Sequence, residues 1–550
     1  MVNGLMVNYL SILAETIRTN WDQPALTDFY LTEDGTAQDT TRGNHYTYGE
    51  MYAEICRVAE LLTALGLQKG DHIAICGANS VHWVIAYLAV AKMQGVSVTV
   101  MHSIQPDEIA RLVIFSDAKL LFTDPDLWSE LQIANRKSLI ENQECDLSVA
   151  ISLSDWSILH SICSQSRRST DGQPTVSYNV IATHSKENLL DELVNGNWTN
   201  GICLDDLAMI CFTSGTSGKA KGVMLPYRAI SSNIGYQYDF LFQFHAKNTI
   251  SFLPLGHILG CVDECLRNVC LGTHINIICQ SIVQIDTLPL CYKIIEPCYV
   301  VLVPALLEKI MRSAHKYLNP SEKYNYIKKE FGKEIKYIFI GAAGLSSQTE
   351  KELQDLNLPI LRGYGATECA PSIANSITFQ QKLGSVGVPV ANNKVRISPA
   401  GEILVKGENV MLGYYKDPEA TAAKIDSDGW LHTGDKGHLD EDGYLYVEGR
   451  LEQDIIVLPN GENIRPDNIE ALINALPEVS ESIVLARDGK LVAIAVLSSP
   501  SLQGRDRVRL SILRTVNPQL PLFSQLYDVE ITDQPLARTE KQTLKRYLYS

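Results

Sequence analysis

The chain has 550 residues, of which 45% are hydrophobic and 20% charged, so it is long enough for several domains and has the composition of a folded globular protein. This excludes disorder, a collagen helix and a coiled coil for the chain as a whole. Acidic residues outnumber basic ones by 63 to 47 and the net charge is −16, which predicts that nucleic acid is not a partner.

The N-terminal segment predicts a packing helix rather than a secretion signal. It has no basic residue before Arg18, and Leu10, Leu13 and Ile17 recur at helical spacing. The most apolar stretch, residues 83–91, is shorter than the roughly 20 residues that span a bilayer. We therefore expect no transmembrane segment.

Thirteen cysteines are scattered along the chain without a Cys-x-x-Cys pair. This pattern indicates reduced thiols and predicts a cytoplasmic protein. Cys261 and Cys265 are spaced to share a helix face, but no histidine or second cysteine pair completes a tetrahedral zinc site.

Helical patterns alternate with short apolar runs through much of the chain, which predicts βαβ units and a mainly parallel sheet. In the first half we expect helices at 48–65, 80–92 and 106–116, and strands at 72–76, 96–100 and 119–122. A similar block covers residues 207–377 and includes apolar runs at 209–212, 300–303 and 337–340. The polar segment 164–174 between the blocks is expected to be an exposed loop.

Beyond residue 394 the pattern changes to short strands and turns, which predicts a small β-rich subdomain over about 394–449. The last hundred or so residues have the pattern of a compact α+β domain. The predicted fold class is α/β and α+β multidomain. A large N-terminal domain of βαβ subdomains carries the β-rich subdomain and precedes a small C-terminal domain.

A run rich in Gly, Ser, Thr and Lys directly follows the apolar residues 209–212: Thr213-Ser214-Gly215-Thr216-Ser217-Gly218-Lys219-Ala220-Lys221-Gly222. Glycines let the backbone approach a polyanion closely, and the hydroxyls, lysines and N–H groups can hydrogen-bond phosphate oxygens. The run therefore predicts a phosphate-binding loop; a flexible Gly/Ser loop is the alternative. It is not a Walker A loop, because Thr213 and Ala220 stand where that motif needs Gly and Ser/Thr.

Further motifs follow in a fixed order at residues 251–257 (SFLPLGH), 363–368 (GYGATE), 430–435 (WLHTGD), 446–450 (YVEGR) and 459–464 (PNGENI). Together with the phosphate loop they resemble the adenylate-forming superfamily, which includes acyl-CoA synthetases, peptide-synthetase adenylation domains and beetle luciferases. The resemblance covers nearly the whole chain. Its closest branch is the long- and medium-chain fatty acyl-CoA synthetases, on the segments 253–264 and 303–310.

The resemblance implies a large AMP-binding domain over residues 1–449, a hinge at 450–452 that contains Glu452, and a small mobile domain over 453–550. It also implies that the cofactors are ATP, Mg²⁺ and CoA. Binding of ATP and AMP is implied for Thr213, Ser214, Gly215, Thr216, Ser217, Gly218, Lys221, Gly341, Ala342, Ala343, Gly363, Tyr364, Gly365, Ala366, Thr367, Asp435 and Arg450. Contacts on the CoA side are implied for Gly461, Glu462 and Asn463.

Catalytic roles are implied for Thr216, His257 and Glu368. Glu368 is suited to Mg²⁺ as a hard oxygen ligand, and Asp435 can accept both hydroxyls of a ribose. Arg450 offers a forked set of donors for ribose or phosphate oxygens. Structural alternatives are a solvated acid for Glu368, an Asx turn for Asp435, a surface salt bridge for Arg450 and a packed interior histidine for His257.

The C-terminal tail departs from the superfamily pattern. Thr543 stands where the superfamily has a lysine that bridges the substrate carboxylate and the α-phosphate, and Gln542 replaces the glycine before it. In an extended segment Lys541 and Lys545 lie on the same side as Thr543, each about 6.6 Å along the chain. Either Lys541 substitutes for the missing cation or adenylation is impaired.

The expected activity is activation of a medium- or long-chain fatty acid to acyl-AMP, followed by transfer to the thiol of CoA. Two alternatives remain open. In the first, the acceptor is the phosphopantetheine arm of an acyl carrier protein instead of CoA. In the second, the chain is an impaired acyl- or nucleotide-binding protein because of Thr543.

Overall fold

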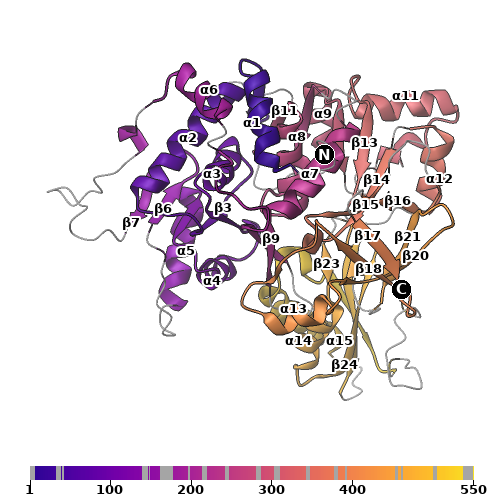
Figure 1. Ribbon diagram of the computed structural model, residues 1–550. Helices are drawn as coiled ribbons and strands as arrows, with labels where there is room; N and C mark the ends of the chain where they lie inside the picture. The colour runs from indigo at the N-terminus through magenta and orange to yellow at the C-terminus, as the bar shows by residue number, and fades with distance from the viewer. Residues whose placement is uncertain are drawn as a thin grey trace.

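The structure is a computed structural model of the chain (Figure 1). It describes residues 7–32, 39, 42–138, 147, 149–161, 178–181, 183–195, 198–213, 220–241, 247–279, 287–302, 307, 310–311, 313–341, 347–358, 360–376, 382–390, 393–451, 456–459, 462–498, 504–534, 536 and 549. The predicted loop at 164–174 lies outside these residues.

An eight-stranded sheet has the order β19-β9-β8-β4-β3-β5-β6-β7. Its central strands pair in parallel, whereas β9 and β19 at one edge and β7 at the other are antiparallel. The strands are β3 (His72–Cys76), β4 (Val96–Thr99), β5 (Leu120–Thr123), β6 (Val149–Ser152), β7 (Ile158–Ser161), β8 (Leu207–Thr213), β9 (Lys221–Pro226) and β19 (Gly413–Tyr414).

A thirteen-stranded sheet has the order β17-β18-β20-β21-β16-β15-β14-β13-β12-β10-β11-β1-β2. It changes from parallel to antiparallel pairing at β14. Its strands are β1 (Pro24–Phe29), β2 (His45–Thr47), β10 (Asn248–Ser251), β11 (His274–Ile278), β12 (Tyr299–Leu302), β13 (Tyr337–Ile340), β14 (Ile360–Gly365), β15 (Ser372–Asn375), β16 (Ser385–Pro389), β17 (Asn393–Ile397), β18 (Glu402–Gly407), β20 (Leu431–Leu439) and β21 (Leu445–Arg450).

The helices of the large domain pack on these sheets and on one another. Helix α1 contacts α7 and α8, and α2 contacts α3. The α-helices are α1 (Tyr9–Thr19), α2 (Tyr48–Ala64), α3 (Val81–Lys92), α4 (Pro106–Phe115), α5 (Pro125–Ser138), α6 (Lys186–Val194), α7 (Tyr227–Leu241), α8 (Arg267–Cys270), α9 (Leu288–Ile295), α11 (Pro320–Glu330), α12 (Ser347–Asp355) and α13 (Pro418–Lys424). A π-helix, η5 (Leu259–Leu266), leads into α8, and short 3₁₀ turns include η3 (Tyr178–Val180) and η6 (Thr367–Cys369).

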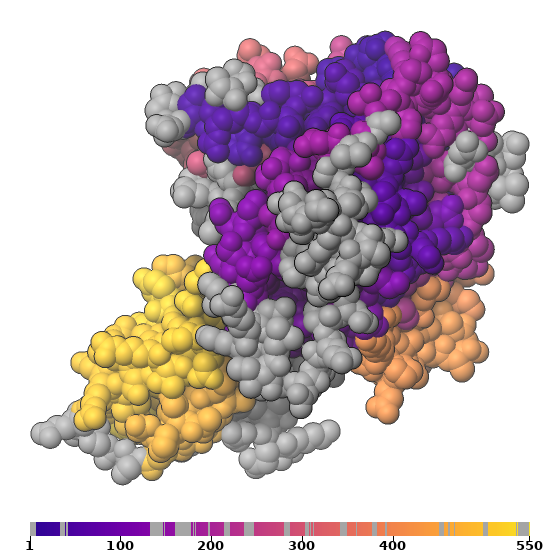
Figure 2. All heavy atoms as spheres, turned by 90° about the vertical axis from the view of Figure 1, so that its left-hand side faces the viewer, coloured from indigo at the N-terminus to yellow at the C-terminus, as the bar shows by residue number. Residues whose placement is uncertain are grey.

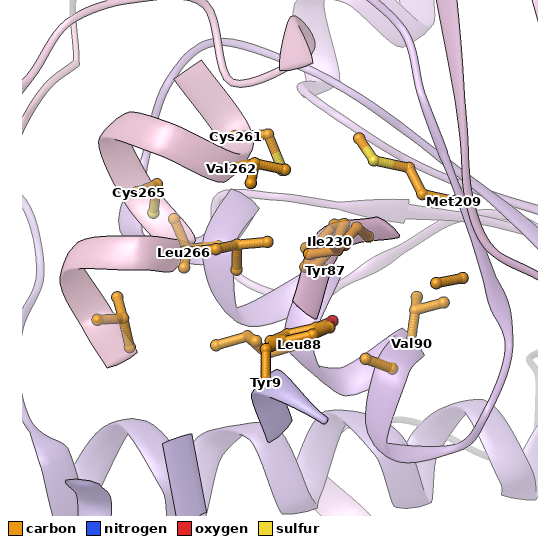
Figure 3. Packing of buried hydrophobic residues seen from close by; sticks show 14 of the residues in the cluster. Tyr9, Tyr87, Leu88, Val90, Met209, Ile230, Cys261, Val262, Cys265 and Leu266 are labelled. Carbon is orange, nitrogen blue, oxygen red and sulfur yellow. The ribbon is translucent and has the colours of Figure 1, made fainter. Parts of the chain in front are cut away.

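Figure 3 shows where these helices meet in the largest hydrophobic cluster. Tyr9 of the N-terminal helix is fully buried there, which confirms the predicted packing helix. The apolar stretch 83–91 forms most of α3, and all of its residues are buried. Its uniform hydrophobicity therefore reflects a core helix. No helix in the described ranges is long and apolar enough to cross a membrane.

Cys261 and Cys265 lie in the same cluster (Figure 3), both nearly inaccessible to solvent. Burial raises the pKa of both thiols, so they stay protonated. The eleven cysteines in the described part of the chain are all free thiols. In those same ranges no three His, Cys, Asp or Glu side chains are grouped to hold a metal ion.

The C-terminal domain is built on the three-stranded sheet β24-β25-β26, beside the small pair β22-β23. It forms the lower left part of the molecule in Figure 2. Its elements are β22 (Ile456–Val457), β23 (Asn463–Ile464), α14 (Pro466–Asn474), β24 (Val479–Arg487), β25 (Lys490–Leu497), α15 (Arg505–Val516), η7 (Asn517–Gln519), η8 (Leu522–Ser524) and β26 (Asp528–Thr532). Apolar residues of the strands and of both helices form a separate core.

The predicted fold class is confirmed, and the expected helices and strands of the first half appear within one or two residues of their predicted bounds. The strands of the predicted β-rich stretch do not form a separate sheet. β21 pairs with β16 of the large sheet, and β19 pairs with β9 of the other sheet. Turn residues in the sequence indicate where short strands begin and end. They do not indicate which distant strand each one pairs with.

Candidate active site

The two ends of the predicted phosphate loop are fixed side by side. Thr213 is the last residue of β8, Lys221 is the first residue of β9, and the two are partners in the antiparallel register. The loop therefore leaves and re-enters the sheet at one point. Ser214, Gly215, Thr216, Ser217 and Gly218 lie outside the described residues.

Lys221 and Glu368 meet through one tyrosine. The Tyr414 hydroxyl donates to Glu368 Oε1 at 2.7 Å, and the Lys221 ammonium lies 4.8 Å from the centre of the Tyr414 ring. Glu368 and Lys221 are both half-buried. Neither side chain forms an ion pair with any residue that the structure describes, and Glu368 Oε2 accepts no hydrogen bond from those residues.

This arrangement fits Mg²⁺ together with a nucleotide better than a metal alone. One carboxylate with an open oxygen is too few ligands for a protein-only cation site. Mg²⁺ is usually held by one or two carboxylates plus substrate phosphates. Lys221 adds a cation on the same side, where it can contact a phosphate.

Helix α7 and the segment before β19 hold the turn that carries Glu368. Asn233, which is 2% exposed, donates to Cys369 O at 2.9 Å and accepts from Ser372 N at 2.9 Å. Met411 N donates to Glu368 O at 2.9 Å. The turn is therefore fixed from both sides, which limits the directions in which the Glu368 carboxylate can point.

The predicted nucleotide residues Tyr364 and Asp435 are joined by a hydrogen bond. The Tyr364 hydroxyl donates to Asp435 Oδ2, and Asp435 is buried, with 8% of the residue exposed. Arg450 is the strand partner of Asp435 between β20 and β21; its side chain is outside the described part of the structure.

The backbone kinks directly before Asp435 without leaving its strand. Residues 433–435 lie within strand β20, where Gly434 has φ +78° and Asp435 N donates to Thr433 Oγ1 at 3.0 Å. Glycine adopts this left-handed conformation at little cost, so the strand can kink without ending. The local hydrogen bond from Asp435 N to Thr433 Oγ1 resembles that of a turn.

The glycines at 363 and 365 are required by packing. A Cβ on Gly363 would lie 2.4 Å from Phe339 Cζ, and a Cβ on Gly365 would lie 2.0 Å from Pro371 O. Ala366 and Thr367 follow and lead to Glu368, so this close approach sets where the carboxylate stands.

Gly341, buried directly after β13, lies near the segment that carries His257. A Cβ on this residue would be 3.9 Å from Leu259 Cδ2, and Leu259 N donates to His257 Nδ1 at 3.2 Å. Ala342 and Ala343 lie outside the described residues. His257 is accessible to solvent, while the surrounding protein lowers the pKa of its imidazole by desolvation. The ring is therefore open to a ligand.

The segment that carries His257 is clamped by two buried residues that the sequence motifs did not identify. Glu264 Oε2 accepts from Phe252 N at 3.0 Å, from Leu253 N at 2.9 Å and from the Ser251 hydroxyl at 3.0 Å. Burial raises the pKa of Glu264 to about 8.

Asn79 completes this clamp from the loop after β3. Its amide donates to Leu253 O at 2.8 Å and accepts from Leu255 N at 2.9 Å. A buried polar residue just after a strand is a weak signal in the sequence, since such residues often serve packing alone.

The remaining predicted residues belong to the C-terminal domain. Asn463 is exposed and begins β23, and burial raises the pKa of the preceding Glu462. Gly461, Glu452, Lys541 and Thr543 lie outside the described residues.

The described contacts connect four motifs that are distant in sequence. A continuous path runs from Lys221 through Tyr414 to Glu368, and the same motif continues from Tyr364 to Asp435. The His257 segment also reaches β8, where the Cys211 thiol donates to Gly256 O at 3.8 Å. Among the described residues, a cation, a carboxylate and a buried aspartate thus lie along one path, which is a set of groups suited to a phosphorylated, sugar-bearing ligand.

Comparison with known proteins identifies the family. The profile of the family described as AMP-binding enzyme matches residues 13–415, and that of the AMP-binding enzyme C-terminal domain matches residues 453–549. The chain is 26% identical over 468 residues to a probable CoA ligase of Humulus lupulus, covering 81% of this chain and 77% of the relative. It is 27% identical over 546 residues to 4-coumarate–CoA ligase 3 of Arabidopsis thaliana, covering 92% and 87%.

Solved structures share the fold over almost the whole chain. The amide bond synthetase of Marinactinospora thermotolerans has a TM-score of 0.69 at 20% identity, covering 98% of each chain. An o-succinylbenzoate CoA synthetase of Bacillus subtilis has a TM-score of 0.66 at 21% identity, covering 98% of this chain and 97% of that one.

Proposed function

The chain belongs to the AMP-binding enzyme family, and on that premise we propose that it joins a carboxylic acid to the thiol of CoA at the expense of ATP. It is a ligase of the AMP-forming acid–thiol class, the class to which its curated relatives belong by name. The observation that carries the proposal is the contact path from Lys221 through Tyr414 and Glu368 to the Tyr364–Asp435 pair.

The reaction has two steps. In the first, a carboxylate oxygen of the acid attacks the α-phosphorus of ATP, forming acyl-AMP and displacing pyrophosphate. In the second, the thiol of CoA loses its proton and attacks the acyl carbonyl, forming the thioester and releasing AMP.

Each group of residues has a proposed part in the first step. Thr213, Lys221 and the loop between them bind phosphate, and Asp435 with Arg450 binds the ribose. Glu368 would hold Mg²⁺, and the bound cation would neutralise part of the negative charge of the phosphates. His257 faces the acid, and the segment from Gly341 lies against the adenine.

The second step requires a different arrangement of the two domains. We propose the domain boundaries 1–449 and 453–550, with the hinge at 450–452. Rotation about Glu452 would bring Gly461, Glu462 and Asn463 to the CoA side, so that one acyl site serves both steps. The free thiols favour a reducing compartment, and we propose the cytoplasm.

Two acid classes are candidates. The segments 253–264 and 303–310 favour a medium- or long-chain fatty acid. The names of several curated relatives favour a hydroxycinnamic acid such as 4-coumarate. CoA is the proposed acceptor, and an acyl carrier protein carrying the same thiol arm is the alternative.

ATP–pyrophosphate exchange across a panel of fatty and hydroxycinnamic acids tests the first step. We expect exchange with at least one class, dependent on Mg²⁺. CoA and a phosphopantetheinylated carrier protein, each offered with the preferred acid, then identify the acceptor. A chain that binds ATP but exchanges pyrophosphate with no acid would contradict the ligase and leave a nucleotide-binding protein.

A further inference from the structure

Resting on the proposed function, we propose that Tyr414 is a positioning residue of the phosphate and cation site. It holds Glu368 and Lys221 so that the carboxylate stays available to a divalent cation and the ammonium to a phosphate. The sequence motifs single out both of these residues, but not the tyrosine between them.

The strand pairing places Tyr414 where it can do this. Tyr414 is the register partner of Val223, and Lys221 is two residues before Val223 on the same strand. Side chains two residues apart lie on the same face of a sheet, so Tyr414 and Lys221 are diagonal neighbours on one face. Tyr415, the next residue, points to the other face, where its hydroxyl donates to Asp117 Oδ2 at 2.7 Å.

The charges explain why a tyrosine is useful here. A lysine and a glutamate in direct contact would neutralise each other, and a ligand would have to break the ion pair. Tyr414 gives each a neutral partner: its hydroxyl occupies Glu368 Oε1, and its ring faces the Lys221 ammonium. Burial and the nearby Glu368 raise the pKa of Tyr414 well above its usual value, so it remains a neutral donor.

Tyr414 is only 5% exposed, so its position is set by packing rather than by the ligand. The Tyr414 N–H donates to Thr421 Oγ1 at 2.8 Å, which fixes the backbone from the side of α13. The donor therefore stands in place before any ligand binds, which lowers the ordering cost of binding.

The test compares Tyr414→Phe with the matched control Tyr415→Phe, which removes one hydroxyl from the neighbouring residue. Binding of Mn²⁺ to the full chain with a non-hydrolysable ATP analogue is followed by the electron paramagnetic resonance signal of free Mn²⁺. We expect Tyr414→Phe to weaken Mn²⁺ binding about tenfold, the effect of one hydrogen bond to a charged group. Tyr415→Phe should bind Mn²⁺ as the wild type does, and the thermal unfolding midpoints report whether both variants are folded.

A double-mutant cycle with Glu368→Gln separates positioning from a general structural effect. If Tyr414 acts through the carboxylate, Tyr414→Phe adds little to the loss caused by Glu368→Gln. Unchanged Mn²⁺ binding in folded Tyr414→Phe, or additive losses in the double variant, would overturn the proposal. Because the measurement needs no acid and no turnover, a failure here is distinct from the absence of pyrophosphate exchange, which would contradict the proposed function.

Discussion

At Asp435 the orientation of one carboxylate depends on a residue 71 positions earlier. The Tyr364 hydroxyl donates to Asp435 Oδ2, and the Asp435 N–H donates to the side-chain oxygen of Thr433. A side chain held in this way before a ligand arrives loses little rotamer freedom when it accepts the hydroxyls of a ribose.

We expect Asp435→Ala to raise the KM for ATP about tenfold, with a smaller effect on the KM for the acid. Hydrogen bonds to ribose are present in both the ground state and the transition state, so their loss weakens binding more than it slows chemistry. Tyr364→Phe removes only the orienting hydroxyl, so it should raise the KM for ATP less than Asp435→Ala does. Steady-state kinetics with each substrate varied in turn measures both. A raised KM for the acid alone would place Asp435 on the acyl side.

At the scale of elements, the segment from β10 to η5 shows how a loop is made rigid. Glu264 and Asn79 bind its backbone. A Cβ on Gly260 would lie 2.3 Å from Pro254 O, so the π-helix packs directly against the loop. His257 therefore stands on a fixed support although it is open to solvent.

Glu264 should make stability depend on pH. Its pKa is raised by burial to about 8 in the folded chain, against about 4.3 when unfolded. The unfolded chain therefore binds fewer protons between these values, and the stabilisation present at low pH is lost as the pH rises toward 8.

Glu264→Gln removes this titration while keeping an oxygen that can accept from Phe252 and Leu253. Relative to the variant, the wild type should lose up to about 1.4 kcal/mol of unfolding free energy per pH unit between 5 and 8. Urea unfolding of both proteins at several pH values measures the difference. A constant difference across this range would show that Glu264 has the same charge in both states.

At the scale of the molecule, the proposed function uses two domains with separate cores. The C-terminal domain has its own hydrophobic cluster, so it can move as a unit without exposing the core of the large domain. In the superfamily a lysine of the C-terminal tail supplies the cation for adenylation, and in this chain Thr543 stands at that position.

We expect Thr543→Lys to increase the rate of ATP–pyrophosphate exchange about tenfold or more, because a cation stabilises the charge that develops at the α-phosphate. Lys541→Ala should lower the same rate if Lys541 is the substitute, and Lys545→Ala is the matched control. The rate of thioester formation from synthetic acyl-AMP and CoA should change less than the exchange rate in all three variants. If no variant alters exchange, no lysine of the tail supports adenylation.

The order of the motifs, the βαβ alternation and the residue types at Lys221, Glu368 and Asp435 were sufficient to predict the fold class and a nucleotide site. These features are local, because periodicity and motif chemistry depend on neighbours along the chain. Tyr414, Asn233, Asn79 and Glu264 could not be identified in that way. Their roles arise from contacts across 46, 136, 174 and up to 13 residues respectively. Only the tertiary structure decides which polar side chain meets which, since strand register and helix packing bring together residues whose own neighbourhoods carry no distinctive pattern.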